Sequence, residues 1–213
     1  MFLLPERAVW WPEKKVLIVA DVHLGKATHL NKAGMSIPNK RANRDITFLT
    51  ILVKELEAEK VIILGDLFHS EHNSEFNLLE EFCRAILPAK AQLVIGNHDI
   101  AGIQHFVDAG LIVREDPYCM APFCFTHDAA LLSHKHDYYI LSGHIHPGVK
   151  LHGKAKQSIS LPCFYFGATY GLLPAFGSLT GLQLIRQSDP AEVFFGIAGE
   201  KVVRIPSLFK SEV

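Results

Sequence analysis

Five short polar segments constrain this chain most, because four of them stand where an apolar run typical of a β-strand ends. The four runs are residues 16–20, 61–64, 92–95 and 138–141, and the fifth polar segment follows residues 123–125. Polar residues at strand ends lie at the carboxyl edge of a sheet, where side chains from several strands converge. We therefore expect a single site built from all five segments. In order, they are Asp21-Val22-His23, Gly65-Asp66, Gly96-Asn97-His98-Asp99, Thr126-His127 and Gly143-His144-Ile145-His146.

The residue types in these segments are those of a metal site with oxygen and nitrogen ligands. Asp, Asn and His suit Mn²⁺, Fe or Zn²⁺ better than soft-metal thiolate chemistry. In Asp21-Val22-His23 and in His144-Ile145-His146, the two ligands are two residues apart, so on an extended strand they point the same way. Gly65, Gly96 and Gly143 precede ligands, where the missing side chain lets the backbone turn tightly.

The first half of the chain alternates between strand and helix patterns. We expect strands over residues 15–20, 61–64 and 92–95, and helices over residues 43–58, 75–87 and 100–109. In the first of these helices the apolar residues fall on one face. This alternation favours a parallel sheet in an α/β domain.

The second half, after Pro117, is mostly short strands. The expected strands cover residues 123–126, 138–142, 149–152, 161–166, 181–186, 192–196 and 201–205. At 213 residues and 49% hydrophobic composition, the chain can bury a sizeable core. We expect one domain over residues 1–213.

The sequence also indicates the cellular location of the protein. No apolar run reaches the ~18 residues that a membrane helix needs. Pro5 and Glu6 interrupt the N-terminal apolar stretch where a signal peptide would continue. We expect a cytoplasmic protein that does not bind a membrane.

The cysteines show no metal or redox motif. None of them forms a C-x-x-C pair, and all have apolar neighbours, so we expect buried, reduced thiols rather than a disulfide or a zinc site. The four are Cys83, Cys119, Cys124 and Cys163.

The net charge of −1 gives no global attraction to nucleic acid, but the charges are unevenly distributed. Residues 26–44 contain five basic residues and no acid, and residues 138–188 contain no acid. These stretches adjoin or contain the polar segments, so a basic rim beside the site is one interpretation. Ordinary solvated lysines are the other, and both stay open. The basic residues are Lys26, Lys32, Lys40, Arg41, Arg44, Lys150, Lys154, Lys156 and Arg186.

Taken in order, the five segments resemble the pattern of the calcineurin-like metallophosphoesterases: D-x-H, G-D, G-N-H-D/E, a lone His and G-H-x-H. The resemblance implies an α/β fold made of a two-sheet sandwich flanked by helices. It covers nearly the whole chain. Within the superfamily, the chain is most similar to the bacterial DNA-ligase-associated phosphoesterases, described as DNA-damage-response endonucleases, on the markers at residues 7–12, 20–26, 64–70 and 173–177.

The resemblance also implies roles for the site residues. Asp66 would bridge two divalent metal ions, for which we expect Mn²⁺, with Fe or Zn²⁺ as alternatives. His98 would lie over the phosphate, as general acid or hydrogen-bond donor, with Asp99 holding its ring and raising its pKa. The remaining ligands would be Asp21, His23 and His146 for one ion, and Asn97, His127 and His144 for the other.

Two residues outside the segments are further candidates. His69 is the additional histidine that we expect to reach the substrate. Lys26 is a candidate phosphate contact, with a solvated lysine as the equal alternative.

Three functions fit these residues. The leading hypothesis is a two-metal phosphodiesterase or nuclease acting on DNA, in a repair system with a DNA ligase and a helicase as partners. The alternative is a phosphatase or nucleotide pyrophosphohydrolase for small molecules, which shares the ligands and differs in the access to them. A binding scaffold ranks lower, because all seven ligands and His98 are present. The sequence does not predict an oligomeric state.

Overall fold

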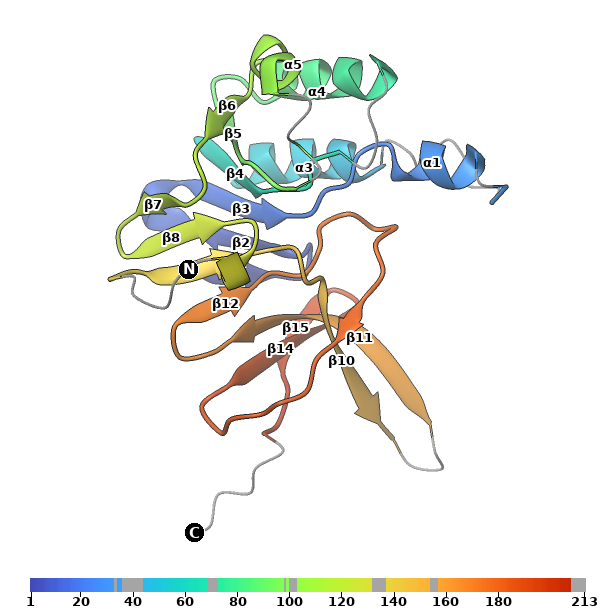
Figure 1. The fold of residues 1–213 in the computed structure, drawn as a ribbon, viewed down its shortest axis with the longest axis vertical. Coiled ribbons are helices and arrows are strands. Elements are labelled where there is room, and N and C mark those ends of the chain that lie inside the picture. Colours follow the sequence, from blue (N-terminus) through green and yellow to red (C-terminus); the bar gives the residue numbers. More distant parts are fainter. Residues whose placement is uncertain are drawn as a thin grey trace.

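The computed structural model describes residues 1–32, 34–35, 44–68, 73–97, 99, 103–131, 137–153 and 157–207. Within these residues the chain forms two β-sheets, and helices cover the outer face of the first sheet (Figure 1). The expected two-sheet α/β architecture is confirmed.

The first sheet has six strands in the order β1-β2-β3-β4-β5-β6. Strands β3 to β6 are parallel, as the strand–helix alternation predicted, while β1 and β2 form an antiparallel edge. The strands are β1 (Phe2–Leu4), β2 (Ala8–Trp11), β3 (Val16–Ala20), β4 (Lys60–Leu64), β5 (Lys90–Val94) and β6 (Ile112–Arg114).

Helices α3, α4 and α5 join the parallel strands and pack on one face of this sheet, whereas α1 lies to its side (Figure 1). Leu49 and Phe82 from two of the helices share a buried cluster with Leu17 and Ile63 of the sheet. No helix in the described part of the chain is long and apolar enough to cross a membrane. The helices are α1 (Lys26–Lys32), α3 (Arg44–Glu55), α4 (Asn73–Ala85) and α5 (Ile103–Asp108), with short 3₁₀ turns η1 (Pro12–Lys14) and η3 (Ala129–Leu131).

The second sheet has nine strands, with β13-β10-β11-β12-β9-β8-β7 as its main order and β14 and β15 attached through β11. Its strands are β7 (Tyr118–Met120), β8 (Phe123–Thr126), β9 (Tyr139–Ser142), β10 (Pro147–His152), β11 (Ser158–Phe166), β12 (Tyr170–Leu172), β13 (Gln183–Leu184), β14 (Val193–Ala198) and β15 (Lys201–Arg204).

The two sheets share a core that follows from the period of two in their strands. Ile18 and Ile62 are buried on the face of the first sheet opposite to the helices, in one cluster with Phe125, Leu141 and Phe164 of the second sheet. Both faces of β3 and β4 are therefore covered, which explains their continuous apolar sequences.

The helices end earlier than expected, for a local reason. Helix α3 stops at Glu55 rather than at residue 58, because Glu57 adopts a left-handed φ of 49°. The Ala58 N–H then donates to the Val53 carbonyl and the Glu57 N–H to the Lys54 carbonyl, which is a Schellman cap. Residues 100–102, where the third expected helix begins, lie outside the described residues.

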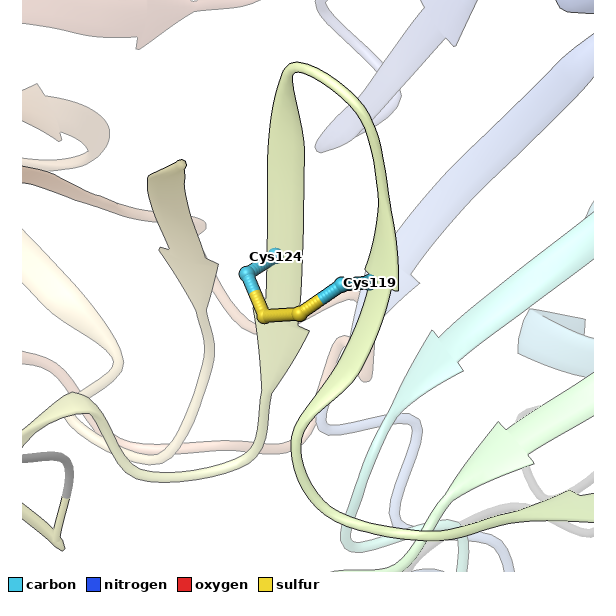
Figure 2. Close-up of a disulfide and its surroundings, with 2 residues drawn as sticks. All are labelled: Cys119 and Cys124. Carbon is cyan, nitrogen blue, oxygen red and sulfur yellow. A yellow bond between two sulfur atoms is a disulfide. The ribbon is translucent and has the colours of Figure 1, made fainter. Parts of the chain in front are cut away.

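The expectation that all four cysteines are reduced thiols is wrong for one pair. Cys119 of β7 and Cys124 of β8 form a disulfide (Figure 2). The antiparallel register places them directly opposite each other, with their Cα atoms 4.0 Å apart. A search for C-x-x-C spacing misses this pair, because a short hairpin can bring residues five apart into contact. Cys83 and Cys163 are free, as expected, and burial raises the pKa of these thiols to about 11 and about 12.

Candidate metal centre

Parallel strands from both sheets end at one place. The register aligns the last residues of β3, β4 and β5, and the chain continues from these ends to Asp21, Asp66 and Asn97. In the second sheet β8 and β9 are parallel and end together, just before His127 and His144. The fold therefore brings together the polar segments of all five strand ends.

The first group of converging side chains is Asp21, His23 and His146. The Nε2 atoms of His23 and His146 lie 3.3 Å apart, and His146 Nε2 lies 3.6 Å from Asp21 Oδ1. One atom from each of the three side chains lies within 4.8 Å of the other two. Asp21 and His23 are buried, whereas 18% of the His146 side chain is exposed.

The second group is Asp66, His127 and His144, with Asn97 beside it. His127 Nε2 lies 3.4 Å from Asp66 Oδ1, 3.0 Å from His144 Nδ1 and 2.8 Å from Asn97 Oδ1. Asn97 Oδ1 thus lies beside the group as a fourth potential ligand atom. Asn97 is exposed and 36% of the His144 side chain is exposed, so this group opens to solvent on their side.

Asp66 lies between the two groups. Its Oδ1 faces His127 Nε2, and its Oδ2 lies 3.9 Å from His23 Nε2 in the first group. A carboxylate placed in this way can give one oxygen to each of two cations. This arrangement of Asp66 turns two separate clusters into one candidate dinuclear centre.

The donor set fits two divalent cations. Asp21 Oδ1 is fully buried without a hydrogen-bond partner, and burial raises the pKa of this carboxyl group. A bound cation would satisfy that oxygen, because a buried carboxylate needs a compensating charge. The mixed carboxylate and imidazole ligands match Mn²⁺, Fe and Zn²⁺.

Backbone contacts fix the direction of the histidine rings. His127 Nδ1 lies 3.1 Å from the Leu64 carbonyl oxygen, which accepts its N–H and leaves the lone pair of Nε2 toward the centre. The backbone N–H of His144 donates to Asp21 Oδ2 at 2.9 Å. The second contact links the two sheets directly at the ligands.

Five of the candidate ligands have left-handed backbone conformations. Such conformations cost on the order of 1–3 kcal/mol each in non-glycine residues and concentrate at functional sites. The φ values are 52° for Asp21, 51° for His23, 45° for Asp66, 67° for His144 and 52° for His146.

The glycines beside the ligands make room for them. A Cβ on Gly65 would clash with the His127 ring, and a Cβ on Gly143 would lie 2.6 Å from Asp21 Oδ2. Both positions therefore exclude every residue with a side chain.

Asp99 ties two ligand loops together. Its Oδ1 accepts the backbone N–H of Leu67 at 3.0 Å and of Phe68 at 3.5 Å, and its Oδ2 accepts that of Gly96 at 3.0 Å. Burial raises the pKa of Asp99 to about 6. His98 lies outside the described residues, so its expected contact with Asp99 stays a prediction.

A segment near the C-terminus supports Asp21 from behind. The Phe176 N–H donates to the Ala20 carbonyl at 2.8 Å, and the Gly177 N–H donates to the Asp21 carbonyl at 3.1 Å. The Arg7 guanidinium donates to the carbonyls of Ala175 and Gly177, each at 3.3 Å. Sequence reasoning marked residues 7–12 and 173–177 as similar to a subfamily but did not anticipate this contact between them.

Lys26, at the start of α1, is close enough to the centre to interact with it. Partial burial lowers the pKa of Lys26, and the Asp21 and Asp66 carboxylates oppose this effect. The other candidates for a basic or histidine rim are less well placed or not described. Lys150, His152 and Arg186 are exposed. His69, Lys40, Arg41, Lys154 and Lys156 lie outside the described residues.

The fold and the two joined ligand groups define a phosphoester hydrolase that uses two divalent metal ions. A sequence model of the calcineurin-like phosphoesterase family matches residues 14–152, so the chain belongs to that family and is a metal-dependent phosphoesterase. Its structure is similar to the crystal structure of Pseudomonas putida nuclease MPE. The TM-score is 0.77 at 27% sequence identity, over 95% of this chain and 93% of that chain. No curated protein matches the sequence.

Proposed function

We propose that this phosphoesterase is a DNA phosphodiesterase or nuclease with a dinuclear Mn²⁺ centre. The observation that carries the proposal is the position of Asp66, whose two oxygens face two separate groups of ligands. Phosphodiesters benefit from two cations, because their negative charge repels an anionic nucleophile.

The proposed ligand roles follow the two groups. Asp66 would be a ligand to both ions. The other ligands are Asp21, His23 and His146 on one side, and Asn97, His127 and His144 on the other.

The residues around the ligands hold this arrangement in a fixed geometry. When bound, two divalent cations would offset the charge of the phosphate and acidify a water molecule. Leu64 fixes the tautomer of His127 by accepting its Nδ1 proton. Asn97 supplies a neutral oxygen, which limits the negative charge that an anionic substrate meets. Asp99 keeps the loops of Asp66 and Asn97 together.

The substrate approaches from the exposed side of the centre, where Asn97, His144 and His146 lie. On this side we place His98, as general acid for the leaving oxygen or as hydrogen-bond donor to the phosphate. Lys26 is a second candidate contact for the phosphate, because it interacts with the carboxylates of the centre.

Three observations support DNA as the substrate. The similar solved structure is that of a nuclease. The markers at residues 7–12 and 173–177, which contact each other, resemble the ligase-associated phosphoesterases. The acid-free stretches 26–44 and 138–188 adjoin or contain ligands. On the same resemblance we propose a DNA ligase and a helicase as partners, and the cytoplasm as the location.

Replacement of the bridging carboxylate tests the metal centre. Asp66→Ala should remove the second ion and nearly all hydrolysis of a small diester, whereas Asp108→Ala, on the surface of α5, should change neither. Metal content is measured by mass spectrometry and the two sites by anomalous scattering. Full activity and a single well-occupied site in Asp66→Ala would reject the dinuclear assignment.

A salt titration tests the substrate. Neutralising Lys26, Lys40, Arg41, Lys150 and Lys154 together should weaken binding of single-stranded DNA and flatten its salt dependence, by about 0.7 in slope per lost phosphate contact. Metal content serves as the reference for an intact centre, because Lys26 is itself a candidate contact for the phosphate of a small diester. An unchanged salt slope, or no DNA binding by the wild type, would favour the small-molecule phosphatase or pyrophosphohydrolase.

A further inference from the structure

A cavity of about 410 Å³ lies beside the metal centre in the described part of the second sheet. This volume is within the range of small-molecule sites, which are mostly apolar with a few polar groups. Its walls come from β9, β12 and β13, and from the loops that carry the ligands. The residues that matter here are Asp128, Tyr138, Ile140, Ile145, Tyr170 and Gln183.

The cavity shares its wall with the ligand loops. Asp128 follows the ligand His127, and its Oδ2 lies 4.0 Å from His144 Nε2. Ile145 stands between His144 and His146. The backbone N–H of Gln183 donates to the His146 carbonyl at 3.0 Å. A molecule in the cavity therefore lies against the loops that carry His127, His144 and His146.

The cavity lining combines flat aromatic rings with apolar surface. Ile140 is buried, while Tyr138 is 41% exposed and lines the cavity, so it is accessible to a ligand. The Tyr170 ring packs 5.4 Å from that of Tyr165, whose hydroxyl donates to Glu192 Oε1 at 3.1 Å. Tyr170 is thus held in place from behind before any ligand binds.

Polar groups in the lining are few and uncharged except for Asp128. The Gln183 amide can both donate and accept, and the Asp128 carboxylate can accept from an amino or imino group. A planar, uncharged heterocycle with hydrogen-bonding edges satisfies both the rings and these groups. A sugar would leave hydroxyls facing Ile140 and Ile145 without partners.

We propose that this cavity binds the nucleobase of the nucleotide whose phosphate lies at the metal centre. The inference rests on the proposed phosphodiesterase function and adds the class of substrate, a nucleotide unit. Stacking of a base on an aromatic side chain is sequence-tolerant, so the cavity selects nucleotides without selecting one base. Tyr138 and Tyr170 are the specificity-determining residues.

The first test compares two diesters that differ only in the nucleoside. The substrates are thymidine 5′-(4-nitrophenyl phosphate) and methyl 4-nitrophenyl phosphate, and the readout is the ratio of their kcat/KM values. Tyr138→Ala should lower this ratio on the order of tenfold, and Tyr138→Phe, which keeps the ring, should largely preserve it. Phe48→Ala is the matched control, because Phe48 is an aromatic residue of similar exposure, 43%, on α3.

The second test measures binding without turnover. Calorimetry should show that the metal-loaded protein binds thymidine 5′-monophosphate more tightly than inorganic phosphate. Tyr138→Ala should reduce the difference by the same factor as in kinetics, and Thr169→Trp, which fills the cavity from an exposed position, should abolish it. Equal affinities in the wild type, or a difference that survives both variants, would overturn the proposal.

The outcomes separate the cavity from the metal centre. Hydrolysis of both diesters at similar rates would reject the nucleobase site and leave the phosphodiesterase function intact. If the wild type hydrolyses neither diester, the phosphodiesterase function is rejected, and the nucleotide-binding measurement still tests whether the cavity binds a nucleobase.

An oligonucleotide with abasic units distinguishes bases of DNA from free nucleotides as the ligand of the cavity. Slower cleavage at those units assigns the cavity to DNA bases, and equal cleavage with retained nucleotide binding assigns it to free nucleotides.

Discussion

Gly143 lies directly before the ligand His144, and its Cα faces the carboxylate of Asp21. In Gly143→Ala the added Cβ would lie 2.6 Å from Asp21 Oδ2, so the carboxylate must move away from its position in the centre. We expect metal affinity to fall about 10–100-fold, the range for disturbed support of a ligand. Titration of the metal-free protein with Mn²⁺ measures this. Gly181→Ala is the control, because open space surrounds Gly181, and an equal effect of both changes would contradict the argument.

A second prediction for a single residue concerns His98, whose role is inferred from the sequence. If it protonates the leaving oxygen, His98→Ala should keep both metal ions and slow turnover by ~10²–10⁴-fold. The loss should shrink for nitrophenolate, a leaving group that needs no proton. An equal loss on good and poor leaving groups would assign His98 to phosphate binding instead.

Asp99 gives the metal-free protein a specific pH dependence. Burial raises the pKa of the folded-state carboxyl group from 3.8 to about 6, so the folded state holds this proton more tightly than the unfolded state. Its contribution to the free energy of unfolding is therefore largest below about pH 4 and falls as the pH rises through 6. In EDTA, the Tm of the wild type minus that of Asp99→Asn should be larger at pH 4.5 than at pH 7. A difference that grows with pH would show that the three N–H donors to Asp99 outweigh its burial.

At the scale of elements, Arg7 joins the β1–β2 edge to residues 175–177, which in turn support Asp21. Arg7→Gln should lower the Tm, because hydrogen bonds from a charged donor contribute about 1.5–3 kcal/mol. It should also weaken Mn²⁺ binding, since the Asp21 loop loses its support. Thermal melts with and without Mn²⁺ measure both effects. Arg204→Gln on β15, where the side chain is exposed, should have neither.

Elements with a strong local signal could be predicted from the sequence. Strands β3 and β4 are nearly continuous apolar runs, β5 ends in one, and α3 and α4 have periodic apolar faces, so each was found within a few residues of its bounds. Strands β1, β6, β7 and β12 have three residues each and were not expected. Such strands have too few residues to show a period, and pairing with neighbours creates them.

In the site, too, features with a local sequence signal could be predicted and those without one could not. The convergence of the seven candidate ligands could be predicted because each follows a recognisable strand end, and the structure brings these side chains together. The contact of Arg7 with residues 175–177 and the pairing of Cys119 with Cys124 were not predicted. Both depend on which segments become neighbours in space, and a single sequence does not encode that locally.

At the scale of the whole molecule, each ligand group draws on both sheets. Bound metal should therefore hold the sheets together, and a ligand at 100 times its Kd stabilises a folded protein by about 2.7 kcal/mol. Adding EDTA should lower the Tm of the wild type clearly and that of Asp66→Ala less, because the variant has only one ion to lose. A wild-type Tm that is insensitive to EDTA under conditions of full Mn²⁺ occupancy would show that the centre does not link the sheets.

The core between the sheets also has a consequence for synthesis on the ribosome. The first sheet is complete at Arg114, while its partner strands β8, β9 and β11 extend to Phe166. The strands that carry Ile18 and Ile62 are thus synthesised well before Phe164 leaves the exit tunnel. Phe164 belongs to the second sheet, which covers this face. Until then the nascent chain presents an apolar surface, a hazard that large proteins share during folding. Chaperones that recognise such surfaces should bind most strongly to stalled chains in which Arg114 has left the exit tunnel and Phe166 has not.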